Sequence, residues 1–333
     1  MATQNIQQIP KGTMNWNEPV NANFAEIKES LEQAEDDISK GNVPVSPTDP
    51  RTIQFAIPPR NFVFEGFDLK NGGRFASPAS MHDAVASGDY KWTRTGDFWP
   101  ITLNGTVHDY ATNTDKNLAN AAFKMEIAGI EVYNRYGDSG DIADGKHHLL
   151  MCSRDLLPWT LQYRSENATW YDTAATNPYL GSHLYQTINN PTNGVLPRLL
   201  ASELGAYVYA GAENKGMRFL GEVKAASATT ATSLAWMGRG RLFLPTEREV
   251  WGQDVWSEHG FGGGAAVQWP LFAGTLKHIQ KGLGEGGSRY AWWGQSSCAG
   301  SAANFCCVTA TGYPNSAAET NAYLSAPLCF LFV

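Results

Sequence analysis

The chain has 333 residues, of which 43% are hydrophobic and 12% aromatic, and its 32 acidic and 25 basic side chains give a net charge of −7. This length supports a hydrophobic core without disulfides, and the aromatic content excludes disorder over most of the chain. An acidic chain without a basic run is poorly suited to bind a phosphate backbone, so nucleic acid is not an expected partner. Membrane insertion is not expected either, because no apolar stretch reaches the roughly 20 residues of a spanning helix.

The first 41 residues carry the clearest periodic pattern. Apolar residues spaced alternately by four and three predict a helix with one coiled-coil seam, formed by Val20, Phe24, Ile27, Leu31, Ala34 and Ile38. Asn17 is suited to cap this helix and Gly41 to end it. A helix of about 20 residues with a narrow apolar stripe is unstable alone in water. We therefore expect residues 1–41 to oligomerise through the seam, with docking on the main domain as the alternative.

Residues 42–100 are expected to form a linker and a small connecting region. The prolines that follow Gly41 are typical of a spacer between the helix and the body of the protein. Further along, Ser77-Pro78 is expected to open a short helix that Gly88 ends.

Residues 101–333 are expected to form the main domain. The expected strands are 101–107, 123–133, 147–153, 290–293, 305–309 and 328–333, and helices are expected near 199–204, from Thr246, and near 272–280. Thr246 and Glu249 form the pattern of a capping box, and Gly252 is placed to end that helix. Strands followed by helices and then strands again, with long loops, favour an α+β fold over a doubly wound sheet.

Five cysteines occur, and none forms a C-x-x-C pair: Cys152, Cys298, Cys306, Cys307 and Cys329. Adjacent residues of a strand point to opposite faces, so we do not expect Cys306 and Cys307 to share a metal or a disulfide. We expect free thiols that act as small hydrophobic side chains in a chain folded in a reducing cytosol.

Motifs for catalysis and cofactor binding are weak. Residues 282–287 match the letters of a dinucleotide fingerprint, but a predicted helix precedes them and a strand follows, which is the reverse of the required order. Asp138, Asp141 and Asp144 could offer oxygen ligands to calcium, yet their spacing favours a solvated hairpin that turns at Asp144-Gly145. No nucleophile elbow or zinc-protease helix is present. We expect no enzyme activity, no cofactor and no metal.

Charge is nearly absent from the C-terminal segment. Between residues 290 and 333, Glu319 is the only Asp, Glu, Lys or Arg, and the same segment is rich in Trp, Tyr and Phe. Such a segment is either buried core or a surface selected for contact with a partner.

Two regions of the sequence resemble known families. The segment NIQQIPKGTMNWNEPVNANFAEIKESL resembles the N-termini of phage tail and fibre proteins, in which a short helix attaches or trimerises the protein on the virion. From about residue 80 onward, the chain resembles a bacterial and prophage family of C-type-lectin-like domains. The landmarks of this second resemblance are, in order, SMHDAVASGDY, WPITLNGT, HHLLMCSRDLLP, RLFLPTEREVWG, AWWGQSS, NFCCVTATGY and APLCFLFV.

The lectin-like family includes the variable proteins of diversity-generating retroelements, in which a stable scaffold displays variable C-terminal residues that bind a host receptor. The resemblance implies scaffold roles for Trp292, Trp293, Phe305, Val308, Pro327 and Phe330. It implies receptor-binding roles for Gln295, Ser296, Ser297, Ser301, Asn304, Cys306, Thr309, Thr311, Tyr313, Asn315 and Ser316. Small polar residues together with Tyr resemble the composition of an antibody paratope.

These resemblances imply a virion receptor-binding protein of the tail or fibre. They also imply an α+β chain with a C-type-lectin-like fold that a short coiled-coil helix precedes. It would be made in the bacterial cytoplasm, trimerise, attach to other virion tail proteins and bind a host cell-surface protein or glycan. The alternatives are a structural tail, head-fibre or baseplate protein that packs on another virion protein and, least favoured, a hydrolase of surface polysaccharide.

Overall fold

The computed structural model describes residues 66–91, 93–133, 146–164, 177–224, 228–258, 267–273, 277–279 and 281–333. All of them belong to one compact unit of the chain, Val63–Val333. The predicted coiled-coil seam (residues 20–38), the three aspartates at 138, 141 and 144, and the turn at Asp144-Gly145 lie outside the described residues.

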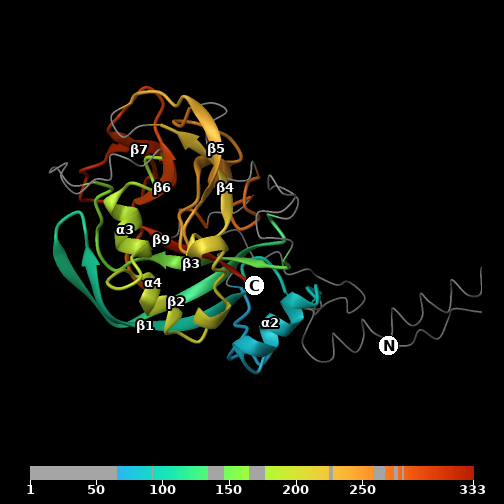
Figure 1. Ribbon diagram of the computed structural model, residues 1–333. Coiled ribbons are helices and arrows are strands. Elements are labelled where there is room, and N and C mark those ends of the chain that lie inside the picture. The colour runs from blue at the N-terminus through green and yellow to red at the C-terminus, as the bar shows by residue number, and fades with distance from the viewer. Residues whose placement is uncertain are drawn as a thin grey trace, which may run out of the picture. The chain divides into compact units, whose positions relative to one another are not determined.

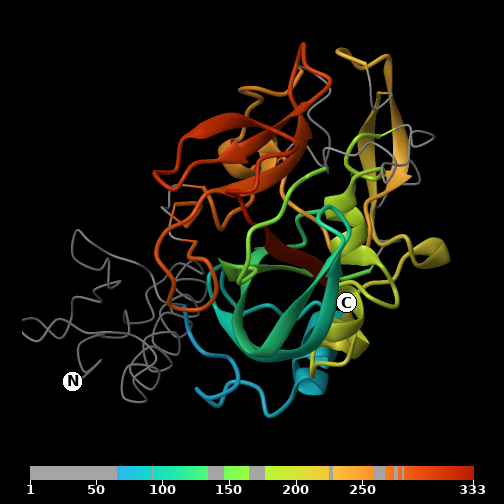
Figure 2. The same ribbon diagram turned by 90° about the vertical axis from the view of Figure 1, so that its left-hand side faces the viewer.

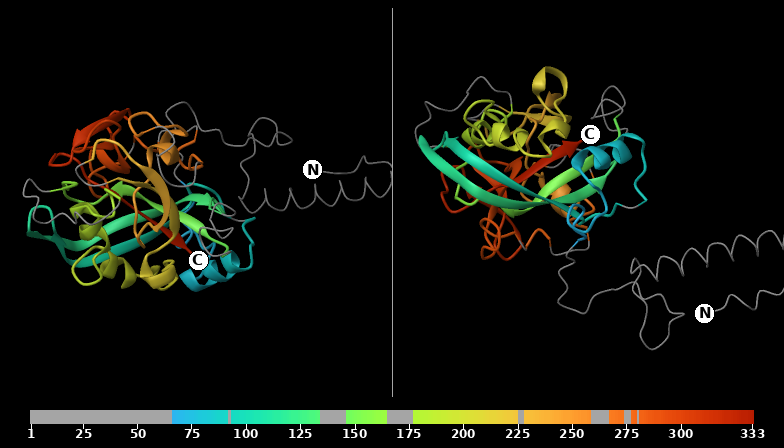
Figure 3. Two further views of the ribbon diagram at one scale, coloured as in Figure 1. Left: turned by 45° about the horizontal axis from the view of Figure 1, so that its top comes forward. Right: turned by 90° about the horizontal axis from the view of Figure 1, so that it is seen from below.

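A four-stranded antiparallel sheet organises this unit (Figure 1). Its order is β1-β2-β3-β9, with β1 Phe98–Asp109, β2 Thr114–Ile130, β3 Leu149–Leu156 and β9 Pro327–Phe332. The four strands expected in these regions are confirmed, and β1 and β2 are longer than expected. They form a long curved hairpin along one side of the unit (Figure 3).

The side chain of Arg198 packs against a bulge in this hairpin. The register of β1 against β2 shifts between Leu103 and Gly105, and Gly105 adopts φ +121°. A Cβ at Gly105 would lie 2.7 Å from Nε of Arg198, which donates from Nε to the carbonyl of Thr106 at 3.0 Å. Glycine is therefore required here, both by the backbone angle and by the close approach of the Arg198 side chain.

Four short α-helices occur in the described residues: α2 Pro78–Ala86, α3 His183–Asn189, α4 Leu196–Leu200 and α5 Glu247–Trp251. The helix that begins after Thr246 has both halves of its capping box, and Gly252 ends it at φ +77°. The helix expected near 199–204 begins earlier, at Leu196, and α3 was not foreseen. Two short 3-10 helices, Gly205–Tyr207 and Ala212–Asn214, follow α4.

The prediction of a helix near 272–280 is wrong for the described part of that range, residues 272–273 and 277–279, where the backbone forms turns. Phe272 stacks on Trp269, and Lys277 forms an ion pair with the buried Glu126 at 2.6 Å. This local ring contact and the long-range ion pair to Glu126 hold the segment in a conformation that helical spacing of apolar residues does not predict.

Two smaller antiparallel sheets lie at the opposite end of the unit from the β1–β2 hairpin (Figure 2). One pairs β4 Arg218–Val223 with β5 Ser233–Gly238. The other, which we call the small sheet, has the order β6-β7-β8, with β6 Trp292–Ser297, β7 Asn304–Val308 and β8 Pro314–Ala318. The described unit is thus a mixed α+β structure with antiparallel sheets, as expected; β4, β5 and β8 were not foreseen.

The C-terminal strand β9 is buried on both faces. Leu328, Phe330 and Phe332 pack in one hydrophobic cluster with residues of the helices, whereas Cys329 and Leu331 pack in a second cluster. A strand that is covered on both faces reads as a continuous apolar run rather than an alternating one, which explains the sequence PLCFLF.

A buried guanidinium joins the small sheet to the rest of the unit. Arg239, which follows β5, is 0% exposed and donates to both carboxylate oxygens of Glu249 in α5, at 2.7 and 2.5 Å. Its Nε donates to the side-chain oxygen of Gln295 in β6. Tyr133, beyond the end of β2, donates its hydroxyl to Glu249 at 2.8 Å. Four separate segments of the chain are therefore fixed around one charge.

Replacing the guanidinium should destabilise the unit strongly. Arg239→Met leaves Glu249 as a buried charge without its counterion, so we expect the free energy of unfolding to fall by about 3–5 kcal/mol. Lys70→Met, which breaks the half-exposed pair of Lys70 with Glu203, should cost about 1 kcal/mol or less. Urea denaturation of the full chain measures both values, and equal losses in the two variants would contradict this role of Arg239.

Candidate functional site

The six predicted scaffold residues are all buried: Trp292, Trp293, Phe305, Val308, Pro327 and Phe330. The indole nitrogen of Trp293 donates to the carbonyl of Leu161 at 2.7 Å, and the ring of Phe305 stacks on Tyr163 with centroids 3.6 Å apart. Trp292 packs in the other hydrophobic cluster, beyond the opposite face of the strand. The small sheet is therefore anchored to the core through both of its faces.

Four of the eleven predicted receptor-binding residues are not displayed, and the prediction needs correction for Gln295, Ser296, Ser297 and Cys306, each at most 6% exposed. Gln295 accepts a hydrogen bond from Arg239, and the hydroxyl of Ser297 accepts one from Lys224 at 3.2 Å. Cys306 lies with its Sγ 3.7 Å from that of Cys298. These polar side chains solvate buried charges or fill the interior, a role that composition alone does not reveal.

The other seven predicted residues are accessible. Thr311, Tyr313 and Asn315 are exposed, and Ser301, Asn304, Thr309 and Ser316 are half-buried. The β7–β8 connection is a tight turn in which Tyr313 donates its N–H to the hydroxyl of Thr309 at 3.0 Å, and Gly312 has φ +87°. Tyr313, 70% exposed, projects from this turn into solvent.

The accessible residues extend along the length of the small sheet instead of gathering at one end. In the antiparallel pairing of β7 with β8, Asn304 pairs with Ala318 and Val308 pairs with Pro314. Asn304 and Tyr313 therefore lie at opposite ends of the small sheet, roughly 15 Å apart at about 3.3 Å per residue. Asn315 and Ser316 lie between them on the edge strand β8.

The single charged side chain of the C-terminal segment points inward. Glu319 is 6% exposed and pairs with Arg164 at 2.5 Å, and its N–H donates to the carbonyl of Ala303 at 2.7 Å. Burial raises the pKa of the Glu319 carboxyl to about 7, and the Arg164 guanidinium opposes that rise. The exposed part of this segment thus presents hydroxyl, amide and aromatic groups without an ionised side chain.

The raised pKa of Glu319 predicts a pH dependence of stability. A carboxyl whose folded pKa exceeds its unfolded value binds more protons in the folded state, so its contribution to stability is fully present below about pH 4.5 and is lost as the pH rises to about 7. A rise from 4.5 to about 7 corresponds to at most about 3 kcal/mol, and partial contact of the carboxyl with solvent reduces this value. Thermal unfolding of the wild type and of Glu319→Gln across this range measures the effect; parallel pH profiles for the two proteins would contradict it.

All five cysteines are free and buried, as expected. Cys152 and Cys329 are paired across β3 and β9 with their sulfur atoms 3.3 Å apart, and Lys281 Nζ lies 3.5 Å from Cys152 Sγ. Burial opposes ionisation of Cys152, but the hydrogen bond from Cys329 and the Lys281 charge lower the pKa of its thiol. Burial raises the pKa of Cys307 to about 12.

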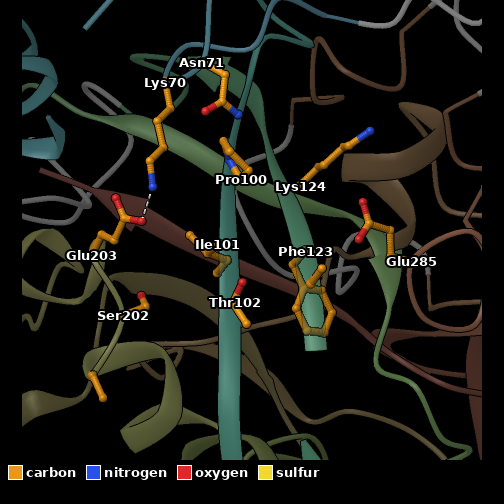
Figure 4. Close-up of a pocket in the computed structure, with 12 residues that line it drawn as sticks. Lys70, Asn71, Pro100, Ile101, Thr102, Phe123, Lys124, Ser202, Glu203 and Glu285 are labelled. Carbon is orange, nitrogen blue, oxygen red and sulfur yellow. Dashed lines mark hydrogen bonds and ion pairs between the residues drawn. The ribbon is translucent and has the colours of Figure 1, made fainter. Parts of the chain in front are cut away.

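A polar groove of about 570 Å³ lies on the outer side of β1 and β2 (Figure 4). Lys70 and Glu203 form an ion pair on one side of it, and Lys124 and Glu285 lie on the other side. The buried side chains of Ile101 and Phe123 contribute to its lining. No sequence motif predicts this groove, because its residues come from five separate segments of the chain.

Two further properties concern the described residues alone. Among them, no three His, Cys, Asp or Glu side chains are arranged to hold a metal ion. No helix in the same part of the chain has the length and apolarity needed to cross a membrane.

Comparison of the chain with family models, curated proteins and solved structures gave no match.

Proposed function

We propose that the chain is a phage virion receptor-binding protein of the tail or fibre, whose lectin-like C-terminal domain binds the host cell surface. The observation that carries this proposal is the small sheet: a segment almost free of charge forms a rigid support for accessible Tyr, Thr, Asn and Ser side chains. Tyr supplies a large contact area with few rotatable bonds, and the small polar residues supply adaptable hydrogen bonds. A surface of this kind is suited to binding rather than to acid–base chemistry.

The positions of the lectin-like landmarks support the same proposal. WPITLNGT lies on β1, HHLLMCSRDLLP on β3, RLFLPTEREVWG at α5, AWWGQSS on β6, NFCCVTATGY on β7 and APLCFLFV on β9. The residues with implied scaffold roles are buried, and most of those with implied display roles are accessible. A variable binding domain requires this arrangement, because buried residues support the fold while accessible residues contact the partner.

A trimer formed through residues 1–41 would present three copies of the small sheet. Linked copies bind a surface with an effective concentration that multiplies moderate single-site affinities. This arrangement suits a particle that meets many identical receptors on one cell.

Deletion of residues 1–41 should convert a trimer to a monomer, because the apolar seam is the proposed contact between copies. Light scattering of the full chain should give about three times 36.3 kDa, and the truncated chain should give a single-copy mass. A full chain that is already monomeric, or an unchanged number of copies after truncation, would contradict the role of the seam.

Binding to host bacteria should depend on both ends of the small sheet. We expect Asn304→Ala combined with Tyr313→Ala to weaken binding of the labelled full chain to host cells at least tenfold, with a nearly unchanged melting temperature because both side chains are accessible. Asn117→Ala combined with Tyr110→Ala, in the β1–β2 hairpin, is the matched control and should bind as the wild type does. Undiminished binding by the first variant would place the receptor site elsewhere.

The structural alternative is a tail, head-fibre or baseplate protein whose small sheet packs on another virion protein. It predicts that the isolated oligomer does not bind host cells at all. A polysaccharide hydrolase is disfavoured, because such enzymes use two carboxyl groups at the site. The one side-chain carboxyl of residues 290–333 is the buried Glu319, and in the adjoining loop 254–258 Asp254 is buried in a pair with Arg248, so Glu258 has no second accessible carboxyl among these residues.

A further inference from the structure

Three loops meet at the end of the small sheet where β6 turns into β7, and we call them the three-loop tip: residues 228–233, 254–258 and 298–304. Ala231 donates its N–H to Glu258 at 2.9 Å, which joins the first loop to the second. Ala299 donates its N–H to the carbonyl of Trp256 at 2.8 Å, which joins the second to the third. The β4–β5 hairpin and the small sheet accordingly lie at the same end of the unit (Figure 2).

A buried carboxylate fixes the middle loop. One oxygen of Glu247, a residue that is 1% exposed, accepts the N–H groups of Val255, Trp256 and Ser257 at 2.9, 2.8 and 2.8 Å. The same oxygen accepts the hydroxyl of Ser257 at 2.8 Å. Hydrogen bonds to an ionised acceptor are roughly twice as strong as neutral ones, so the backbone that carries Trp256 is held in one conformation.

A buried ammonium fixes the third loop. Lys224 is 2% exposed and donates to the carbonyls of Cys298 and Ser301, at 3.2 and 2.8 Å, and to the hydroxyl of Ser297 at 3.2 Å. The hydroxyl of Ser301 in turn accepts the N–H of Asn304 at 3.1 Å. The charges of Glu247 and Lys224 thus lie beneath the surface and order the loops above them.

The surface of the tip carries one large exposed ring, and its one accessible charged side chain is the half-buried Glu258. Trp256 is 44% exposed and Val255 is 41% exposed. The accessible side chains around the three loops are small or hydroxylated, namely Thr229, Thr230, Thr232, Ser233, Ala299, Ser301 and Ala303. Within these loops Asp254 and Glu258 are the charged residues; Asp254 pairs with Arg248 at 2.6 Å, and Glu258 accepts the N–H of Ala231.

We propose that the three-loop tip binds a neutral saccharide, with the indole of Trp256 against the apolar face of a sugar ring. A sugar ring presents C–H groups on its faces and hydroxyl groups around its edge, which matches an indole surrounded by Thr and Ser hydroxyls. The rigid loops reduce the entropy that binding would cost. This inference rests on the proposed function and specifies the chemical class of the receptor.

The composition of the tip favours a saccharide over a protein partner. Stable protein interfaces bury about 800 Å² on each partner around a central apolar cluster, whereas this tip offers one ring and one Val among hydroxyls. An anionic glycan would require an exposed cation, and the described residues of the three loops contain no Lys or Arg.

The test measures binding of the labelled full chain to intact host bacteria, to cells oxidised with periodate, which cleaves the vicinal diols of sugars, and to cells shaved with protease. Trp256→Ala is the test variant, and Trp256→Phe retains an aromatic ring at the same position. Phe67→Ala is the matched control, because Phe67 is 40% exposed and lies beside the four-stranded sheet. We expect Trp256→Ala and periodate each to weaken binding at least tenfold. Trp256→Phe, Phe67→Ala and protease treatment should leave most of the binding intact.

Neutrality is tested by salt, because screening weakens attraction between charges and leaves neutral contacts unchanged. Binding should change less than twofold between 50 and 500 mM sodium chloride. Binding that survives periodate or Trp256→Ala, or that is lost with protease treatment or high salt, overturns the saccharide inference while the proposed function stands. A wild-type chain that does not bind host cells overturns both.

Discussion

The guanidinium of Arg239 constrains the architecture more than any other group we describe. It is removed from water, so it is stable only where carboxylate and carbonyl oxygens surround it. Glu249 and Gln295 supply these oxygens from α5 and β6. Their positions fix the small sheet on the core. The accessible side chains of the small sheet are therefore carried by a rigid backbone. The same requirement explains why Gln295, which lies among residues expected to face a receptor, faces inward.

Other buried charges act in the same way beneath the accessible surface. Glu247 and Lys224 hold the loops of the tip through backbone groups, and Glu319 pairs with Arg164 below the small sheet. Each of these groups orders the chain around it from beneath the surface. At the small sheet and the adjoining loops, buried charges therefore support a contact surface made mostly of hydroxyl, amide and aromatic groups, which is the physical basis of the proposed binding role.

Local signals made much of the fold predictable. The capping residues of α5 and the apolar strands β3 and β9 are recognisable because their patterns depend on near neighbours in the sequence. The strand β8, with the sequence PNSAA, has no such pattern and exists because β7 pairs with it. Burial of Ser297 depends on Lys224, which is distant in the sequence. The position of Trp256 depends on hydrogen bonds from its loop to Glu247, which no spacing rule identifies. Neither could be inferred from composition or spacing.

The central claim is that the small sheet and the adjoining loops contact the host cell. Hydrogen–deuterium exchange of the full chain, with and without host envelope fragments, tests it most directly. The account predicts slower exchange of backbone amides in residues 254–258, 298–304 and 309–316, and unchanged exchange around the groove formed by Lys70 and Glu203. Protection confined to that groove or to the β1–β2 hairpin, with none at the small sheet, would contradict the account.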